Sequence, residues 1–117
     1  MNIQIYINKK NPDVLKAERF FKERRIPYQL IEMKKHPLGK RELQTMIAAV
    51  GAAALVDRSG PRALERPVAH MSDENLIASV LLEDSSALIS PIVRNGAKVT
   101  VGAREDVWKE WVQKENG

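Results

Sequence analysis

The segment from Ile5 to Phe21 has the residue types of a redox-active or anion-binding site. A strand-like stretch leads through the basic pair Lys9 and Lys10 into an Asn-Pro-Asp tripeptide, which is typical of a helix start. A helix N-terminus attracts anions because its first N–H groups lack partners and its dipole is positive there. The same field activates the thiols of redox proteins. This chain has no cysteine, so it carries no thiol chemistry, disulfide, zinc–thiolate site or iron–sulfur cluster of its own.

The residues at this helix start allow both a binding and a purely structural interpretation. Asn11 could hydrogen-bond a ligand, or it could only cap the helix that begins at Pro12. Lys9 and Lys10 could hold an anion, or they could lie in a solvated loop. Asp13 already places a negative charge in the positive field of the helix, which argues against tight anion binding.

Two candidates lie elsewhere in the chain. Arg58 could bind an anion, or it could pair with Asp57, Glu65 or a helix end. Ser90 offers a hydroxyl, but the sequence positions no base beside it, and an unactivated serine is a poor nucleophile.

The composition limits the class of protein. With 117 residues, 44% hydrophobic and 29% charged, the chain has the size and core of one globular domain. The net charge of +4 permits an acidic partner, but the basic run from Lys22 to Arg25 predicts a solvated face, not a nucleic-acid site. We recognise neither a signal peptide nor a membrane span, so we expect a cytoplasmic protein without membrane contact. His36 and His70 lack metal-ligand spacing, and we predict no metal and no cofactor.

The first third of the chain predicts a β-α-β unit. Isoleucine alternates with polar residues over Ile3–Ile7, which predicts a strand. Asn11 caps a helix whose apolar stripe reaches Phe21, and Pro27 stops that helix before a second strand over Tyr28–Glu32. So compact a unit places its two strands parallel, with a right-handed crossover.

The middle of the chain is predicted to be helical. Lys40–Val50 has apolar residues at helical spacing and ends at Gly51. A turn and a short helix follow over residues 57–66. Ser72 is predicted to cap a third helix, which runs to about Leu82.

The last third returns to strands. Asn95-Gly96 separates two apolar segments, Ile92–Arg94 and Lys98–Val101, and therefore predicts a β-hairpin. The final predicted helix, over residues 104–113, buries Trp108 and Trp111 as core residues.

The predicted order is β-α-β, three helices, then β-β-α. This is the order of an α/β fold of the thioredoxin-like (glutaredoxin-like) kind, with a four-stranded mixed sheet and a helical insertion. We expect one domain over residues 1–117. Residues 1–36 and 86–117 would form its thioredoxin-like core, and residues 37–85 its helical insertion.

Three segments resemble the arsenate reductase-like (ArsC) proteins and their relative Spx. These are "IYINKKNPDVLKAERFFKERRIPYQLIE" (5–32), "LVDRSGPRALER" (55–66) and "SPIVRNGAKVTVGAREDVWKEWV" (90–112). The resemblance covers nearly the whole chain, and its last segment is the most specific. It implies a thioredoxin-like fold in which Pro91 is a cis proline beside the active site.

The chain departs from this family where the chemistry lies. The resemblance puts the family's nucleophilic cysteine at Asn11 and its partner cysteine at Val14. The resemblance puts two supporting basic residues of the family at positions that Leu15 and Ser90 occupy in this chain. Only Arg58 therefore remains of the family's oxyanion-binding residues. Arsenate reduction of the family's glutathione/glutaredoxin type needs a thiolate that attacks arsenic, and an asparagine amide cannot replace it.

The resemblance therefore implies a family member that has lost its reductase chemistry and serves as a binding or regulatory module. The partner would be a protein, and the Spx likeness suggests RNA polymerase by analogy, without direct nucleic-acid contact. The alternative is a residual glutathione-dependent enzyme or an oxyanion sensor. Its vestigial anion site would comprise Lys10, Asn11, Arg58, Ser90 and Pro91.

Overall fold

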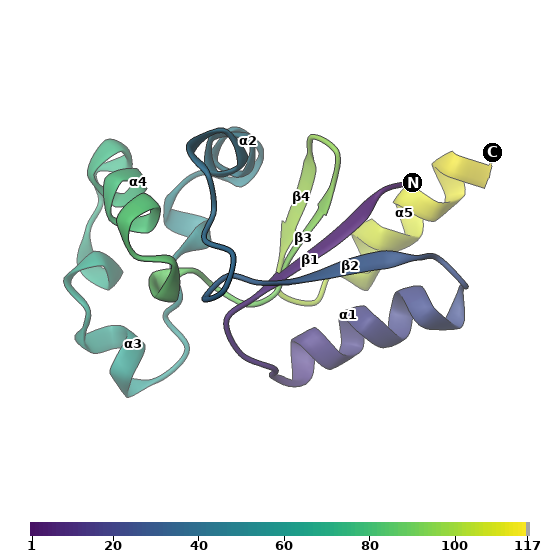
Figure 1. Cartoon of the computed structure of the whole chain (residues 1–117), viewed down its shortest axis with the longest axis horizontal. Helices are drawn as coiled ribbons and strands as arrows, with labels where there is room; N and C mark the ends of the chain where they lie inside the picture. The colour runs from purple at the N-terminus through teal and green to yellow at the C-terminus, as the bar shows by residue number, and fades with distance from the viewer. Residues whose placement is uncertain (117) are drawn as a thin grey trace.

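The structure is a computed structural model that describes residues 1–116. Four strands form one sheet in the order β2-β1-β3-β4 (Figure 1). They are β1 Ile3–Ile7, β2 Tyr28–Glu32, β3 Ile92–Asn95 and β4 Lys98–Val101. β1 pairs parallel with β2 and antiparallel with β3, and β3 pairs antiparallel with β4. The prediction of an α/β fold with a four-stranded mixed sheet is confirmed.

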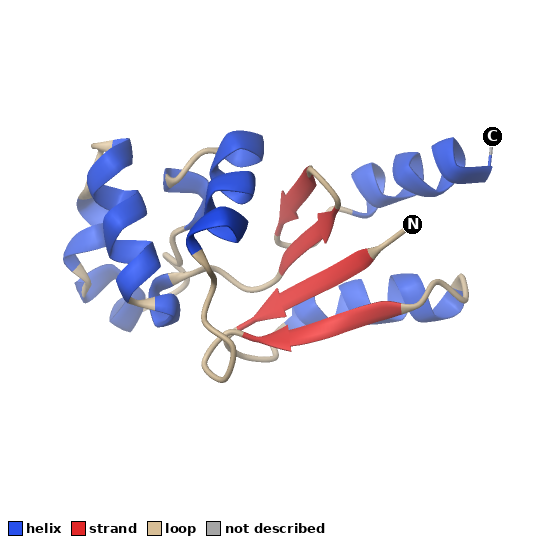
Figure 2. Ribbon diagram, turned by 45° about the horizontal axis from the view of Figure 1, so that its top comes forward, coloured by secondary structure: helices blue, strands red, loops and turns tan. Residues whose placement is uncertain are grey.

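Helices cover the sheet unequally. Figures 1 and 2 show α1 and α5 along one face, with α2 on the other face and α3 and α4 beyond one end of the strands. The helices are α1 Pro12–Glu23, α2 Lys40–Val50, α3 Pro61–Glu65, α4 Glu74–Glu83 and α5 Glu105–Asn116. Three 3₁₀ turns connect them: η1 Ala53–Leu55, η2 Pro67–His70 and η3 Ser85–Ala87. No helix in the described part of the chain is both long and apolar enough to cross a membrane.

Helix α1 fixes the geometry of the β-α-β unit. Asn11 is its N-cap and Pro12 its first residue, as predicted. The helix ends at Glu23, several residues before Pro27, because Arg25 adopts a left-handed conformation with φ 54°. The chain can therefore turn directly into β2.

Two helix boundaries differ from the prediction. The N-cap of α4 is Asp73 instead of Ser72, because the Asp73 carboxylate accepts a hydrogen bond from the Leu76 amide at 3.0 Å. Helix α5 extends beyond the predicted residue 113 to Asn116, since the added residues include good helix formers and no terminator.

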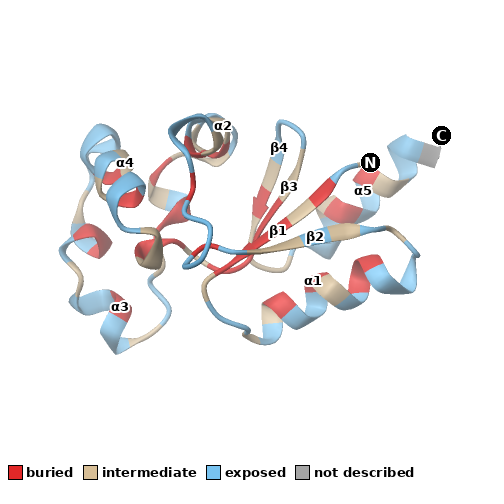
Figure 3. Ribbon diagram, viewed as in Figure 1, coloured by how far each residue is buried: buried red, intermediate tan, exposed pale blue. Residues whose placement is uncertain are grey.

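The sheet separates two hydrophobic cores, which Figure 3 shows as buried segments on the strands and the inner helix faces. The first packs α1 and α5 on the isoleucines of β1 and contains the rings of Phe20, Phe21 and Trp108, which contact one another in edge-to-face and tilted arrangements. Trp108 is fully buried, and its Nε1–H donates to Thr100 Oγ1 at 2.9 Å. The second core lies under α2 and α4 and includes Tyr6 and Met46. Burial of each large side chain stabilises the fold by about 1.5–3 kcal/mol. Because residues of β1 and α1 belong to these cores, the turn between the two elements has a rigid support.

Candidate functional site

Asn11 lies at the mouth of α1 with both polar groups of its side chain engaged. Its Oδ1 accepts a hydrogen bond from the Val14 amide at 2.8 Å, which is the capping interaction. Its Nδ2 donates to the carbonyl of Ser90 at 2.9 Å. The amide is therefore fixed by the fold, and it presents no nucleophile at the helix mouth.

Ser90 and Pro91 lie beside Asn11, and the peptide bond between them is cis, which confirms the prediction for Pro91. Ser90 is buried, and its Oγ accepts a hydrogen bond from the Asn8 amide at 2.7 Å. No base contacts this hydroxyl within residues 1–116, so it has no means of activation.

Asn8 was not predicted from the sequence to be a site residue. In the structure its side chain and backbone connect three segments of the site. Its Nδ2 donates to the carbonyls of Ser85 at 2.7 Å and Leu88 at 3.0 Å. Its Oδ1 is buried and has no hydrogen-bond partner among the described residues. An asparagine just after a strand is ordinary turn chemistry, so its type and position gave no signal of this role.

Lys10 and Arg58 do not join Asn11 and Ser90. The Lys10 ammonium is 3.6 Å from the Glu18 carboxylate, along the side of α1. Arg58 Nε donates to the carbonyl of Ala69 at 3.1 Å, and its Nη1 donates to that of Ala53 at 2.8 Å. Arg58 thus connects η1 with η2 through backbone carbonyls, which matches the helix-end alternative more closely than the anion-ligand or carboxylate-pair alternatives.

A pocket of about 480 Å³ opens beside the helix mouth. Four cationic residues line it: Lys9, Lys34, Arg62 and Arg66. Its other lining residues include Ser59, Ser86, Ser90, Asn8 and one acid, Asp57. The pocket therefore carries an excess of positive charge. Most of that charge comes from residues that were not part of the anion site predicted from the sequence.

The four pocket cations are not equally available. Arg66 pairs with Asp84 at 3.0 Å, and Lys9 is 3.8 Å from Asp57. Lys34 and Arg62 make no ion pair within the part of the chain that the structure describes. Arg62 and Arg66 are four residues apart at a short helix, a spacing that could have indicated a shared face. Lys34 lies in a loop, and its position in the sequence gave no indication that it would line a pocket.

Of the acids in the described residues, Asp57 alone lines the pocket, and it is held ionised. Burial raises its pKa, but the hydroxyl and amide of Ser59 and the nearby Lys9 outweigh that effect, so the pKa of Asp57 lies below its usual value. The carboxylate offsets part of the pocket's positive charge at neutral pH. The arrangement can hold an anion. The Ser59 hydroxyl donates to the Asp57 carboxylate, but the lowered pKa of Asp57 makes that carboxylate a weak general base.

The histidines contribute nothing to this site. His36 is exposed, and the ring of His70 lies with Nε2 2.6 Å from the carbonyl of Leu64. Within residues 1–116 no three His, Asp or Glu side chains are grouped closely enough to hold a metal ion.

Comparisons with known proteins connect the chain to one group of structures. No protein-family model and no curated protein matches it. Among solved structures, the YffB protein is similar at 19% identity and TM-score 0.78, covering 92% of this chain and 96% of that one. An arsenate reductase (ArsC) related protein from Brucella melitensis is 22% identical at TM-score 0.68, over 96% and 95% of the two chains. A Staphylococcus aureus protein is 27% identical at TM-score 0.72, over 92% and 96%.

These similarities span nearly the full length of each chain. The chain therefore has the fold of arsenate reductase-related proteins. Sequence identities at this level establish shared architecture and leave function to be argued from the site itself.

Proposed function

We propose that the chain is a cysteine-free member of the ArsC/Spx family, without reductase chemistry, which acts in the cytoplasm as a binding or regulatory module. One observation carries this proposal. Asn11 stands where the resemblance puts the nucleophile, and both polar groups of its side chain are bonded inside the fold. An amide cannot attack arsenic or change redox state, so the first step of the family reaction has no reagent. RNA polymerase is the partner that the likeness to Spx suggests.

The surroundings of Asn11 also lack what a thiolate would need. Leu15 and Ser90 occupy positions where the resemblance implies basic residues, and Arg58 is engaged by two carbonyls. A restored thiol would have the helix dipole alone to lower its pKa and hold the oxyanion. The wild-type protein and Asn11→Cys should both show no arsenate reduction above a blank when supplied with glutathione and glutaredoxin. Turnover that persists through a second purification would refute the proposal.

Anion binding without chemistry is a second candidate, favoured by the basic pocket. Lys34 and Arg62 line it without ion pairs in residues 1–116. We infer that a small oxyanion would bind between them and Lys9. This differs from the predicted site, because Lys10 and Arg58 are used within the fold.

A thermal-shift titration with sulfate, phosphate and arsenate tests this candidate. An anion at 100 times its dissociation constant stabilises the folded state by about 2.7 kcal/mol, which raises the melting temperature by several degrees. The double variant Lys34→Ala, Arg62→Ala should lose the shift. Lys109→Ala with Lys114→Ala removes the same charge from α5 and should keep it. A flat response in the wild-type protein would dismiss the candidate.

A further inference from the structure

Strand β2 forms an open edge of the sheet (Figure 2). The Met33 amide donates to the carbonyl of Ile7 at 2.8 Å, which fixes the side of the chain that faces β1. Because the polar backbone groups of a strand point alternately to its two sides, those of Tyr28 and Leu30 point away from β1. No hydrogen bond in the described part of the chain uses these outward N–H and C=O groups.

The opposite edge of the sheet is different. Strand β4 packs against helix α2, and its residues Val99 and Val101 contribute to the core beneath that helix. Residues of β2 are buried less than those of β1, since none of Tyr28–Glu32 is fully buried. The β2 edge is therefore open to another strand, and the charge and apolar surface around it, described next, decide what kind of strand it favours.

An apolar side chain lies alongside this edge. Glu18 Oε1 accepts a hydrogen bond from the Tyr28 hydroxyl at 2.9 Å, so the stripe of α1 that carries Glu18 runs beside β2. Leu15 and Lys22 lie three and four residues from Glu18 and belong to the same stripe. Leu15 is 55% exposed, more than any other large hydrophobic side chain described. A strand added to β2 would cover it.

The surroundings of the edge are strongly basic. Residues 1–41 hold eleven Lys and Arg against four Asp and Glu, a net charge of +7. The remaining residues hold eight against eleven, a net charge of −3. The cations Lys22, Arg25, Lys34 and Lys35 lie in the segments just before and after β2. These four are called the edge cations below.

We propose that the β2 edge binds an extended acidic segment of a partner protein, which adds to the sheet as a fifth strand. The outward backbone groups would pair with the segment's backbone, Leu15 would contact an apolar side chain of it, and the edge cations would attract its carboxylates. A second copy of this chain would bring its own cations against these, so self-pairing is disfavoured. A nucleic acid would leave the strand's N–H and C=O groups without the repeating partners of a β-ladder.

A designed peptide tests the proposal directly. The probe is a fluorescein-labelled, end-capped Glu-Val-Glu-Val-Glu-Val-Glu, titrated by fluorescence anisotropy in about 50 mM salt, where screening is weak. Its binding should shift NMR amide signals of residues 28–32 and of Leu15. The same peptide with alternate backbone nitrogens methylated on its pairing side keeps every charge but should not bind. Equal binding of the methylated peptide, or shifts confined to other elements, would overturn strand addition.

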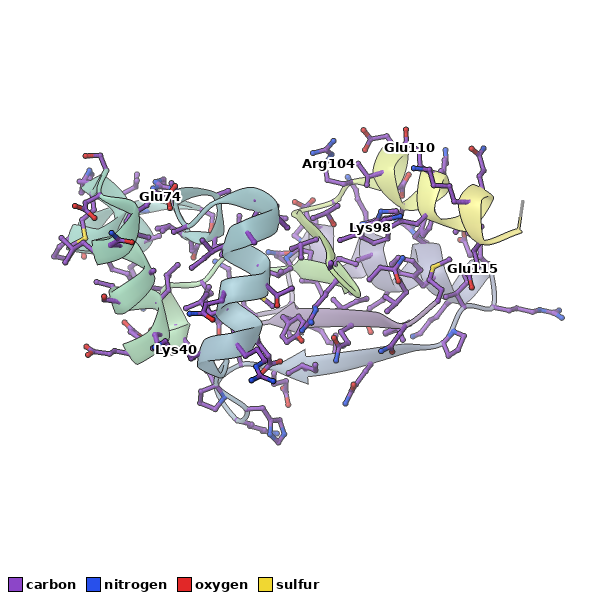
Figure 4. The ribbon with its side chains drawn as sticks, turned by 90° about the horizontal axis from the view of Figure 1, so that it is seen from above. Lys40, Glu74, Lys98, Arg104, Glu110 and Glu115 are labelled. Carbon is purple, nitrogen blue, oxygen red and sulfur yellow. The ribbon has the colours of Figure 1, made fainter. Side chains whose placement is uncertain are left out.

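Matched charge variants test the acidic preference. Arg25→Glu with Lys35→Glu should weaken peptide binding by about tenfold. Lys98→Glu with Arg104→Glu makes the same change of charge in β4 and in the loop between β4 and α5 (Figure 4). This variant should bind the peptide within about twofold of the wild-type affinity. Equal losses in the two variants would show attraction by net charge alone and overturn the assignment to β2. Equally tight binding of Lys-Val-Lys-Val-Lys-Val-Lys, or a wild-type dimer that the edge variant disrupts, would also overturn it.

The inference rests on the proposed binding role, and its surface shares only Lys34 with the pocket beside the helix mouth. Failure of the peptide to bind would refute the binding role proposed for the β2 edge. It would not affect the proposal that the chain lacks reductase chemistry. Arsenate turnover would refute the proposed function and would leave the peptide result unchanged. The two failures are therefore distinguishable.

Discussion

The mouth of α1 and the edge of β2 belong to the same β-α-β unit, yet they use their polar groups in opposite ways. At the mouth, the Asn11 amide and the Ser90 hydroxyl are bonded to the protein's own backbone. The Arg58 guanidinium, away from the mouth, is likewise bonded to the backbone of η1 and η2. At the edge, the outward backbone groups of Tyr28 and Leu30 have no partner in residues 1–116. A group used within the fold contributes to stability, whereas an unused one is available to a ligand.

This difference separates two kinds of residue that look alike in a sequence. Arg58 and Arg62 are both arginines near one turn, but the first donates to two carbonyls and the second lines a pocket without an ion pair in the described residues. Substitution at the mouth should therefore change the free energy of unfolding. Substitution at the edge or in the pocket should change binding.

The largest effect on stability is expected for Arg58→Ala. It removes two hydrogen bonds from a charged donor and leaves the carbonyls of Ala53 and Ala69 without that partner. We expect the free energy of unfolding to fall by about 2–3 kcal/mol in urea denaturation. The control Arg62→Ala should stay within about 0.5 kcal/mol of wild type. Similar losses in both variants would contradict the distinction between them.

Asn11→Ala should cost slightly less, about 2 kcal/mol. It removes the N-cap acceptor for Val14, worth about 1 kcal/mol, and the donor to the Ser90 carbonyl, worth about as much. Asn11→Asp keeps the capping oxygen and loses the donor, so it should recover roughly half of the loss. If both variants matched wild type in chemical denaturation, Asn11 would not have the structural role described here.

A smaller effect concerns alkaline pH at the contact between α1 and β2. Burial and the hydrogen bond to Glu18 raise the pKa of Tyr28 to about 12. The unfolded pKa is about 10, so the phenol stabilises the folded state below about pH 10, and this contribution is lost as the pH rises toward 12. Over that pH range, the free energy of unfolding of the Tyr28→Phe variant should therefore fall less than that of the wild-type protein. Parallel pH profiles from denaturant titrations would contradict this.

The smallest effect on stability is expected at the edge itself. Arg25→Glu with Lys35→Glu alters exposed side chains. Among the residues that the structure describes, it removes one ion pair, between Lys35 and Glu32 at 3.1 Å, and both side chains are largely exposed. The free energy of unfolding should stay within about 0.5 kcal/mol of wild type, while peptide affinity falls. A loss above about 1 kcal/mol would assign these cations to the fold.

The fold was predictable where local patterns and topology agree. Alternation in Ile3–Ile7, the Asn-Pro helix start and the Asn95-Gly96 turn each determine one element, and the structure has β1, β2 and β4 at their predicted bounds. Cap choice was less predictable, since Ser72 and Asp73 are both good caps and only the backbone position selects Asp73.

The site was harder to predict because it depends on contacts far apart in the sequence. Asn8 reaches carbonyls 77 and 80 residues away, and neither its type nor its neighbours indicate this. The pocket forms where the β1–α1 turn meets residues 57–66, so Lys34, Arg62 and Arg66 gain meaning only in the folded chain. The edge of β2 likewise depends on strand order, which places β3 on the other side of β1.

Amide hydrogen exchange in the ligand-free protein tests the contrast between mouth and edge most directly. The Asn8 and Val14 amides donate to Ser90 Oγ and Asn11 Oδ1, whereas the Leu30 amide points outward from β2. We predict that the Asn8 and Val14 amides exchange about a hundredfold or more slowly than the Leu30 amide, relative to their intrinsic rates. Slow exchange at Leu30, or exchange at Asn8 and Val14 as fast as at Leu30, would contradict the account.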